Sequence, residues 1–235
     1  MSMSSREMIL ARLRQSAPSP ASAGASLQET GQMLMDYYQQ HTPRTPAGER
    51  IRQFAAALEA AHAEVYICSE LDWAGKLAEK LEQNGIRRLL LNKRLPVLQT
   101  LLPLLPAACS VTGYEQPIEI WKQNLFDDID AGLTLARSGI ANTGTLILAP
   151  DSGTPRTVSL VPPLHIALVY ASTLHADMYS AQQTERWSLG MPANLVMVSG
   201  PSKTSDIQQT LAYGAHGPRR MWVIVIDDLQ AGEAA

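Results

Sequence analysis

The sequence has few of the residues that build metal clusters or disulfide frameworks. It contains only two cysteines, Cys68 and Cys109, in 235 residues. An iron–sulfur cluster takes about four cysteine ligands and a structural zinc about four Cys or His ligands, so these two cysteines indicate neither site. We expect both thiols to act as small buried apolar groups, and we expect no metal and no cofactor in this chain.

Long apolar runs and an excess of charge of one sign are also missing. No apolar stretch approaches the roughly 18 residues of a membrane span, and the opening MSMSSREMILARLRQ lacks a signal-peptide core. The 19 basic and 22 acidic side chains give a net charge of −3, with no basic block to bind a nucleic acid backbone. The sequence therefore predicts a cytoplasmic protein with no membrane span and no nucleic-acid partner.

The chain does have enough apolar material for a core, since 46% of its residues are hydrophobic. Its beginning differs from the rest. A capping-box pattern predicts a short helix near the N-terminus, and the small, proline-bearing stretch APSPASAGAS (17–26) indicates a flexible linker. Residues 27–40 are weakly helical. We expect an N-terminal helical segment and linker at residues 1–45 and one domain at residues 46–235.

Within this domain, strand-like and helical patterns alternate. The strand-like runs are EVYICS (64–69), IRRLLL (86–91), TLILA (145–149), HIALVY (165–170), NLVMVS (194–199) and MWVIVI (221–226). The helical patterns lie at 46–62, 71–83, 176–189 and 206–213. Such alternation indicates parallel βαβ units, so we predict an α/β domain with an open, largely parallel sheet flanked by helices. Ligands of such sheets bind at the carboxyl ends of strands, which directs attention to the loops after Ala149 and Val198.

The loop SGPSKTSDI (199–207) is rich in hydroxyl groups. Ser205 and Gln208 have capping-box spacing, which predicts a helix that begins at Asp206. The free backbone N–H groups of such a helix start favour an anion. The candidate ligand-binding residues of this loop are Ser199, Gly200, Ser202, Lys203 and Thr204. The alternative is a capped turn with a solvated lysine.

Two further polar segments flank TLILA. In ANTGT (141–145), the glycine between two threonines suits a close approach of the backbone to a ligand, but it also suits an ordinary turn or bulge. In PDSGTPRTVSLVPPLH, Arg156 is available to clamp a carboxylate or phosphate, although such an arginine is more often a surface or ion-pair residue. The candidate ligand-binding residues here are Asn142, Thr143, Gly144, Thr145 and Arg156.

Two histidines are candidate proton carriers. His165 opens an apolar strand, and His216 follows a predicted helix end in GAHGP. A structural histidine and a turn residue are the alternatives. No HExxH, EF-hand or GxSxG pattern occurs, nor a GxGxxG after a strand, so the catalytic residues stay undefined.

The succession ANTGTLIL, DSGTPRTVSLVPPLHIALV and SGPSKTSDIQQTLAYGAHGPRRMWVIVIDD resembles the LUD-domain family, in particular its lactate-utilisation protein C branch. The resemblance covers residues 63–228, with its specific motifs in the second half. It implies a fold similar to the ribose-phosphate isomerase and CoA-transferase group. It also implies a role beside two iron–sulfur lactate-utilisation proteins in the oxidation of L-lactate to pyruvate, with the iron–sulfur clusters in those partners.

This chain departs from the family pattern at two positions. Family members usually carry Glu or Asp before the TGT motif and Glu at the position of Gln208, whereas this chain has Asn142 and Gln208. An amide forms hydrogen bonds but takes no proton near neutral pH. Any mechanism that relies on those carboxylates is therefore in doubt here.

The leading hypothesis is a cluster-free subunit of a lactate-oxidation system that binds a small anion. One alternative is a standalone enzyme acting on sugar phosphates or CoA esters, which rests on fold analogy. Another is a non-catalytic scaffold or regulatory protein. The sequence leaves open whether the chain is an enzyme by itself.

Overall fold

The computed structural model describes residues 5–16, 20–42, 44–205 and 211–229. The chain divides into two compact units, Met1–Pro43 and Arg44–Ala235. No helix of the described residues is long and apolar enough to cross a membrane.

The first unit contains two helices, α1 (Ser5–Ser16) and α2 (Pro20–His41). The predicted linker at 17–26 is therefore wrong for residues 20–26, which form the start of α2. Pro20 suits the first helical turn because the N–H that it lacks has no intrahelical partner there. The alanines that follow have the highest helix propensity of all residues.

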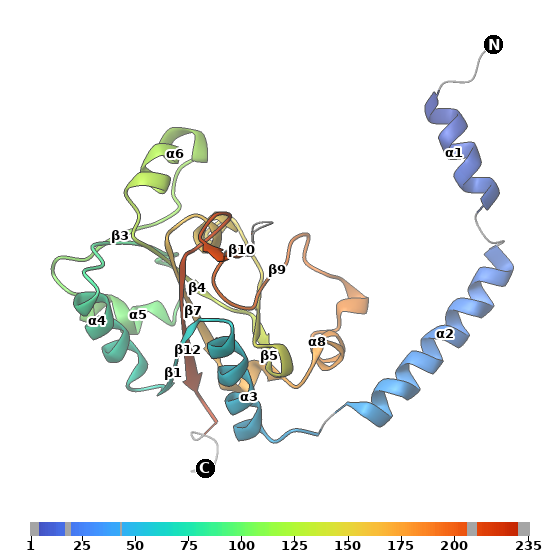
Figure 1. The fold of residues 1–235 in the computed structure, drawn as a ribbon, viewed down its shortest axis with the longest axis horizontal. Helices are drawn as coiled ribbons and strands as arrows, with labels where there is room; N and C mark the ends of the chain where they lie inside the picture. Colours follow the sequence, from blue (N-terminus) through green and yellow to red (C-terminus); the bar gives the residue numbers. More distant parts are fainter. Residues whose placement is uncertain (1–4, 17–19, 43, 206–210, 230–235) are drawn as a thin grey trace. The chain divides into compact units, whose positions relative to one another are not determined.

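The second unit is built on a six-stranded sheet with the order β1-β12-β7-β4-β2-β3 (Figure 1). Its strands are β1 (Glu64–Ser69), β2 (Arg88–Leu90), β3 (Ser110–Thr112), β4 (Ala131–Leu135), β7 (Leu164–Tyr170) and β12 (Arg220–Asp227). All neighbouring strands pair in parallel. The prediction of an open parallel sheet flanked by helices is confirmed.

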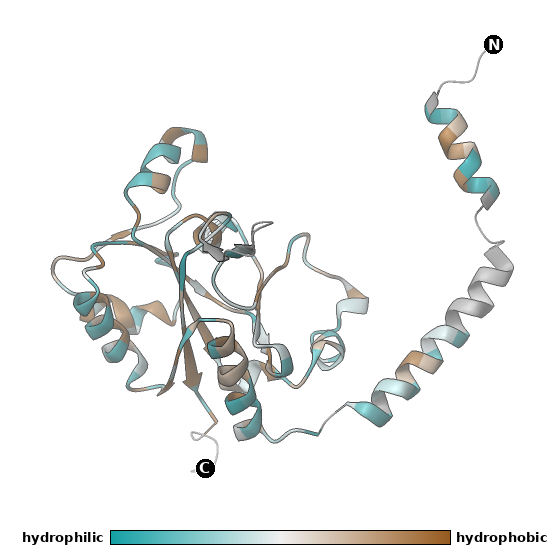
Figure 2. Cartoon of the chain, in the orientation of Figure 1, coloured by the Kyte–Doolittle hydropathy of each residue, from teal (hydrophilic) through white to brown (hydrophobic). Residues whose placement is uncertain are grey.

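Both faces of this sheet are covered, which is why its central strands are almost continuously apolar. On one face, Ile166 and Ile224 pack with residues of α4 (Trp73–Gln83) and α5 (Leu98–Leu101). On the other face, Ala167 and Val223 pack with residues of α3 (Ala47–Ala60) and of a second sheet. Figure 2 shows the strands in brown between helices that carry teal residues.

The second sheet has the order β8-β5-β6-β9. Its strands are β5 (Ser138–Ile140), β6 (Thr145–Leu148), β8 (Leu174–His175) and β9 (Val196–Val198). The runs TLILA and NLVMVS thus form β6 and β9, which pair antiparallel outside the parallel sheet. The link from β5 to β6 is a short turn through η2 (Ala141–Thr143), which is too short for a parallel crossover.

Shorter elements complete this unit. They are η1 (Leu102–Leu104), α6 (Ile118–Asp127), α7 (Thr157–Leu160), η3 (Ala171–Thr173), α8 (Met178–Thr184) and η4 (Trp187–Leu189). The predicted helix at 176–189 is shorter than expected, because Arg186 takes a left-handed conformation with a φ of 53° just after α8.

The predicted helix at 206–213 is wrong in its last part. Residues 206–210 lie outside the described residues, whereas β11 (Leu211–Tyr213) is a strand that pairs antiparallel with β10 (Lys203–Ser205). Ser205 pairs with Leu211 in this ladder. Ser205 therefore belongs to a strand, and the argument for an anion at a helix start there is lost.

Candidate functional site

Two cavities lie on the face of the six-stranded sheet that the second sheet covers. The first, of about 190 Å³, lies where β4 ends, and we call it the arginine cavity. Its polar lining residues are Thr134, Arg137, Asp151, Thr154, Arg156 and Ser159. The second, of about 200 Å³, we call the histidine cavity. Its polar lining residues are Ser159, His165, Ser199, Ser202 and His216.

The arginine cavity contains two guanidinium groups in different settings. Arg137 is held by Glu185, with 2.7 Å between Arg137 Nε and Glu185 Oε2. Arg156 is exposed and forms no ion pair with any acidic side chain of the described residues. One arginine is thus fixed in position, and the charge of the other is free to meet an anion.

Glu185 is itself the centre of a hydrogen-bond network. It accepts hydrogen bonds from Ser138 Oγ and, at 2.9 Å, from Trp187 Nε1. His175 Nε2 lies 3.5 Å from Glu185 Oε1, the oxygen that also accepts from Ser138. Burial raises the pKa of Glu185, but these hydrogen bonds and the charge of Arg137 outweigh burial and lower the pKa below its ordinary value. Glu185 is therefore a carboxylate that orients Arg137.

A buried polar wall separates the two cavities. His165 Nε2 and Thr134 Oγ1 lie 2.9 Å apart, and the two residues are only 1% and 3% exposed. His165 lines the histidine cavity, Thr134 lines the arginine cavity, and Ser159 lines both. Burial lowers the pKa of His165 to about 4, so its imidazole is neutral at pH 7.

The histidine cavity brings together the loop after β9 and the segment before β12. The backbone N–H of Ser202 donates to the carbonyl of Pro218 at 2.8 Å, and the N–H of Gly214 donates to the carbonyl of Ser202 at 2.9 Å. His165 and Met221, which also line this cavity, lie near the amino ends of β7 and β12. The expectation that the loop after Val198 lies at carboxyl ends of parallel strands is therefore wrong.

The ANTGT segment reaches the histidine cavity only through hydroxyl groups. Thr145 Oγ1 lies 2.7 Å from Thr143 Oγ1 and 2.7 Å from Ser199 Oγ, and Ser199 lines that cavity. Asn142 is exposed, and its backbone N–H donates to the carbonyl of Ala176. Asn142 and Thr143 line neither cavity.

Gly144 serves packing in this structure. Its φ of +59° favours glycine, and an added Cβ would lie 2.8 Å from the backbone nitrogen of Leu58 in α3. Gly144 therefore allows the turn from η2 into β6 to lie directly against that helix.

The predicted site residues are thus divided. Arg156 lies in the arginine cavity, whereas Ser199, Gly200 and Ser202 lie in the histidine cavity with both histidines. Lys203 and Thr204 belong to β10 and line neither cavity. Asp206 and Gln208 lie outside the described residues.

Sequence reasoning missed Thr134, Arg137, Ser159 and Glu185. Thr134 carried the clearest signal, since it is a single hydroxyl inside the apolar stretch AGLTLA. A polar group in a strand buried on both faces needs a partner, and His165 is that partner.

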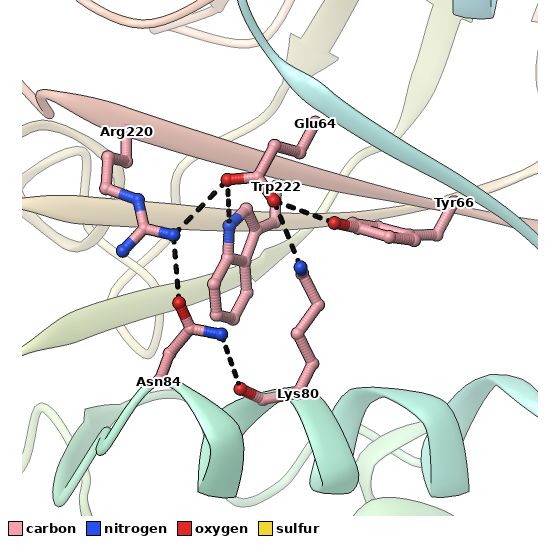
Figure 3. Close-up of polar contacts among 6 residues, drawn as sticks. All are labelled: Glu64, Tyr66, Lys80, Asn84, Arg220 and Trp222. Carbon is pink, nitrogen blue, oxygen red and sulfur yellow. Dashed lines mark hydrogen bonds and ion pairs between the residues drawn. The ribbon is translucent and has the colours of Figure 1, made fainter.

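A third polar cluster surrounds Glu64 and joins β1, β12 and α4 (Figure 3). Glu64 accepts hydrogen bonds from Tyr66, Lys80, Trp222 and Arg220. Burial raises its pKa, but the four donors outweigh burial and lower the pKa of Glu64 to about 2. Both carboxylate oxygens are occupied, so we assign this cluster to stability.

Of the two cysteines expected to be buried, Cys68 is buried and Cys109 is only partly buried. Cys68 is buried in the core and Cys109 packs against it, and burial raises the pKa of each thiol. Among the described residues, no group of three or more His, Cys, Asp or Glu side chains is arranged to hold a metal ion.

The fold and the cavities define an α/β protein with small polar cavities on one face of a parallel sheet. A model of the LUD domain matches residues 51–226, and the chain belongs to the LUD domain family. An uncharacterized protein of Neisseria meningitidis serogroup B is 37% identical over 95% of this chain and 94% of its own length.

Other relatives match over part of the chain. Lactate utilization protein C of Shouchella clausii is 38% identical over 42% of this chain and 44% of its own length. The same protein of Halalkalibacterium halodurans is 36% identical over 43% and 46%, so the match spans less than half of these relatives. The crystal structure of a DUF162 family protein from Deinococcus radiodurans superposes with a TM-score of 0.59 at 25% identity, covering 77% of this chain and 99% of that protein.

Proposed function

We propose that this chain is the cluster-free subunit of a lactate-utilisation system that oxidises L-lactate to pyruvate with two iron–sulfur partner proteins. Membership of the LUD domain family supports this role, as do relatives named lactate utilization protein C. The oxidation removes two electrons and two protons from lactate. In our proposal the partners' clusters accept the electrons, which agrees with a chain that has only two cysteines.

We further propose that the arginine cavity binds the small carboxylate. The observation that carries this proposal is Arg156, an arginine without an acidic partner in the described residues, in the same cavity as Arg137. A guanidinium group matches a carboxylate with two parallel hydrogen bonds. A cavity of about 190 Å³ suits a three-carbon acid better than a larger substrate.

Thr134 and Ser159 supply hydroxyl groups for the 2-hydroxyl of lactate. Thr134 Oγ1 lies 2.9 Å from His165 Nε2, and this contact holds the Thr134 side chain in place. With a pKa of about 4, His165 is a weak proton acceptor at neutral pH, so we assign it a positioning role. His216 lines the other cavity, away from the carboxylate in this proposal.

The decisive experiment is lactate-dependent dye reduction by the two partner proteins, with and without this chain. We expect activity to require the chain and Arg156→Ala to raise the KM for lactate at least about tenfold, because a charged hydrogen bond is lost. Arg156 is exposed, so the variant should fold. Arg87→Ala, which removes an exposed arginine outside both cavities, is the matched control.

Four results would contradict the proposal. Partners that reduce the dye equally well alone would remove the subunit role. Full activity of Arg156→Ala would remove the arginine cavity as the site, and a loss with Lys203→Ala alone would move the anion to the SGPSKT loop. Turnover of lactate by the isolated chain would show that it is an enzyme without its partners.

A further inference from the structure

A larger recess lies farther along the carboxyl edge of the six-stranded sheet. It consists of two adjoining cavities of about 260 and 340 Å³, where β2 and β3 end. The two cavities share Lys93, Gly113 and Glu115 in their lining. We call this recess the β2–β3 groove. It lies at the carboxyl ends of parallel strands, where open α/β sheets bind their ligands.

The loop 151–154 separates the groove from the arginine cavity. Ser152 and Gly153 line the groove, while Asp151 and Thr154 line the arginine cavity. Asp151 Oδ1 accepts the backbone N–H groups of Gly153 and Thr154 at 2.8 and 2.6 Å.

Asn92 ties this loop to the turn after β2. Asn92 Nδ2 donates a hydrogen bond to Thr154 Oγ1 at 3.2 Å, and Asn92 Oδ1 accepts one from the backbone N–H of Arg94 at 3.0 Å. An added Cβ on Gly153 would lie 2.5 Å from Asn92 Nδ2, so a side chain there would displace the amide that ties this loop to the turn after β2. The groove and the arginine cavity are therefore separate sites with a fixed wall between them.

One end of the groove carries positive charge. Lys93 and Arg94 both line it, and Arg94 forms no ion pair within the described part of the chain. Lys93 Nζ lies 3.7 Å from Glu115 Oε1, and both side chains are largely exposed. An ion pair this long and this exposed contributes little stability, so Lys93 is available to an incoming anion.

Two aromatic rings line the remainder. Tyr114 lines one cavity and Trp121 the other, and their rings meet edge to face with 4.9 Å between centroids. Trp121 Nε1 donates to the carbonyl of Gln116 at 3.2 Å. The indole is thus fixed before any ligand arrives, which suits stacking against a planar group. Glu115, between the cations and Trp121, offers a carboxylate to sugar hydroxyl groups.

We propose that the β2–β3 groove binds a nucleotide. The phosphate lies at Lys93 and Arg94, the ribose hydroxyls at Glu115, and the base against Trp121. Cavities of this combined size accommodate ligands of a few hundred Å³, whereas a three-carbon acid would leave most of the groove empty. This site is independent of the arginine cavity and goes beyond the proposed function.

The test is titration calorimetry and thermal shift of the full chain with ADP, GDP, NAD⁺, adenosine and inorganic diphosphate. We expect at least one nucleotide to bind about tenfold or more tightly than adenosine and than diphosphate, since it uses both ends of the groove. The affinities of NAD⁺ and ADP are compared to show whether the groove binds a free nucleotide or the nucleotide half of a dinucleotide. Quenching of tryptophan fluorescence by the bound nucleotide reports contact with an indole.

Variants locate the site. We expect the double variant Lys93→Ala/Arg94→Ala to weaken nucleotide binding at least about tenfold, and Trp121→Leu to weaken it by a similar factor. Lys93 and Arg94 are exposed, so the double variant should fold even where Trp121→Leu does not. Lys122→Ala is the matched control, because Lys122 is an exposed cation of α6 that does not line the groove.

Each remaining outcome decides against the nucleotide. The proposal is overturned if no nucleotide at about 1 mM changes the melting temperature or the calorimetric signal. It is also overturned if the double variant binds like the wild type, or if diphosphate binds as tightly as the nucleotides. The variant Arg156→Ala should keep full nucleotide affinity. A loss of affinity in this variant would assign the nucleotide to the arginine cavity. Failure of lactate-dependent activity leaves these binding results unaffected.

Discussion

Replacement of Glu64 by Gln tests how the edge strand β1 is held. In the wild type, Glu64 Oε2 accepts from Tyr66 at 2.7 Å and from Lys80 at 3.0 Å. Glu64 Oε1 accepts from Trp222 at 2.9 Å and from Arg220 at 3.2 Å. Glutamine keeps the shape of the side chain but replaces one of these oxygens with an NH₂ group and removes the charge.

The expected cost follows from the pKa of Glu64. A fall from 4.5 to about 2 corresponds to an upper limit of about 3.4 kcal/mol, at about 1.36 kcal/mol for each pKa unit. The side chain is 43% exposed, so solvent screens much of this interaction. We expect Glu64→Gln to lower the free energy of unfolding by about 1–2 kcal/mol at pH 7.

The pH dependence gives the sharper test. Because folding lowers the pKa of Glu64, the charge stabilises the fold fully above pH 4.5, and this stability is lost as the pH falls toward 2. Urea denaturation at pH 7 and pH 3 should therefore show that less than half of the cost remains at pH 3. Glu82→Gln, at an exposed position of α4, is the control. An equal cost at both pH values would refute the electrostatic explanation.

Three further predictions concern positions that the structure explains. Gly144→Ala should lower the free energy of unfolding by about 2 kcal/mol or more in urea denaturation, because of its positive φ and the contact with Leu58; an unchanged midpoint would contradict this. The free energy of unfolding should fall by up to about 3 kcal/mol between pH 6.5 and pH 4, because His165 binds a proton in the unfolded chain over this range but stays neutral in the folded chain. The variant His165→Gln should lose this pH dependence in acid titrations followed by circular dichroism. Cys68 should react with a thiol reagent at least about tenfold more slowly in the folded chain than in urea, and more slowly than the partly buried Cys109; equal rates in the folded chain and in urea would disprove the burial of Cys68.

The sequence predicted the strands that are buried on both faces, and it did so for a physical reason. β7 and β12 match the runs HIALVY and MWVIVI because covered parallel strands are continuously apolar. The sequence did not predict β4, because Gly132 and Thr134 interrupt its apolar run. Gly132 is needed there, since an added Cβ would collide with the carbonyl oxygen of Val158.

The site was predicted less well than the fold, because its parts are joined only by tertiary contacts. A short loop pattern identified the segments around Arg156 and Ser199, but it gave no sign that they line different cavities. Residues 211–213, the last part of the helix predicted at 206–213, form a strand because pairing of β10 with β11 overrides local capping preference. The burial of His165, which makes it a weak base, depends on tertiary packing and is invisible in a linear pattern.

The short helix α7 explains how the two cavities are kept together. Arg156 precedes α7, and Ser159 lies within it with its Oγ donating to the Arg156 carbonyl at 3.0 Å. α7 approaches β4 closely because Gly132 has no side chain. That approach puts Ser159 beside the pair of Thr134 and His165, so one close contact of helix and strand determines the wall that both cavities share. The DSGTPRTVSL segment therefore contributes lining residues to both cavities and forms the structural link between them.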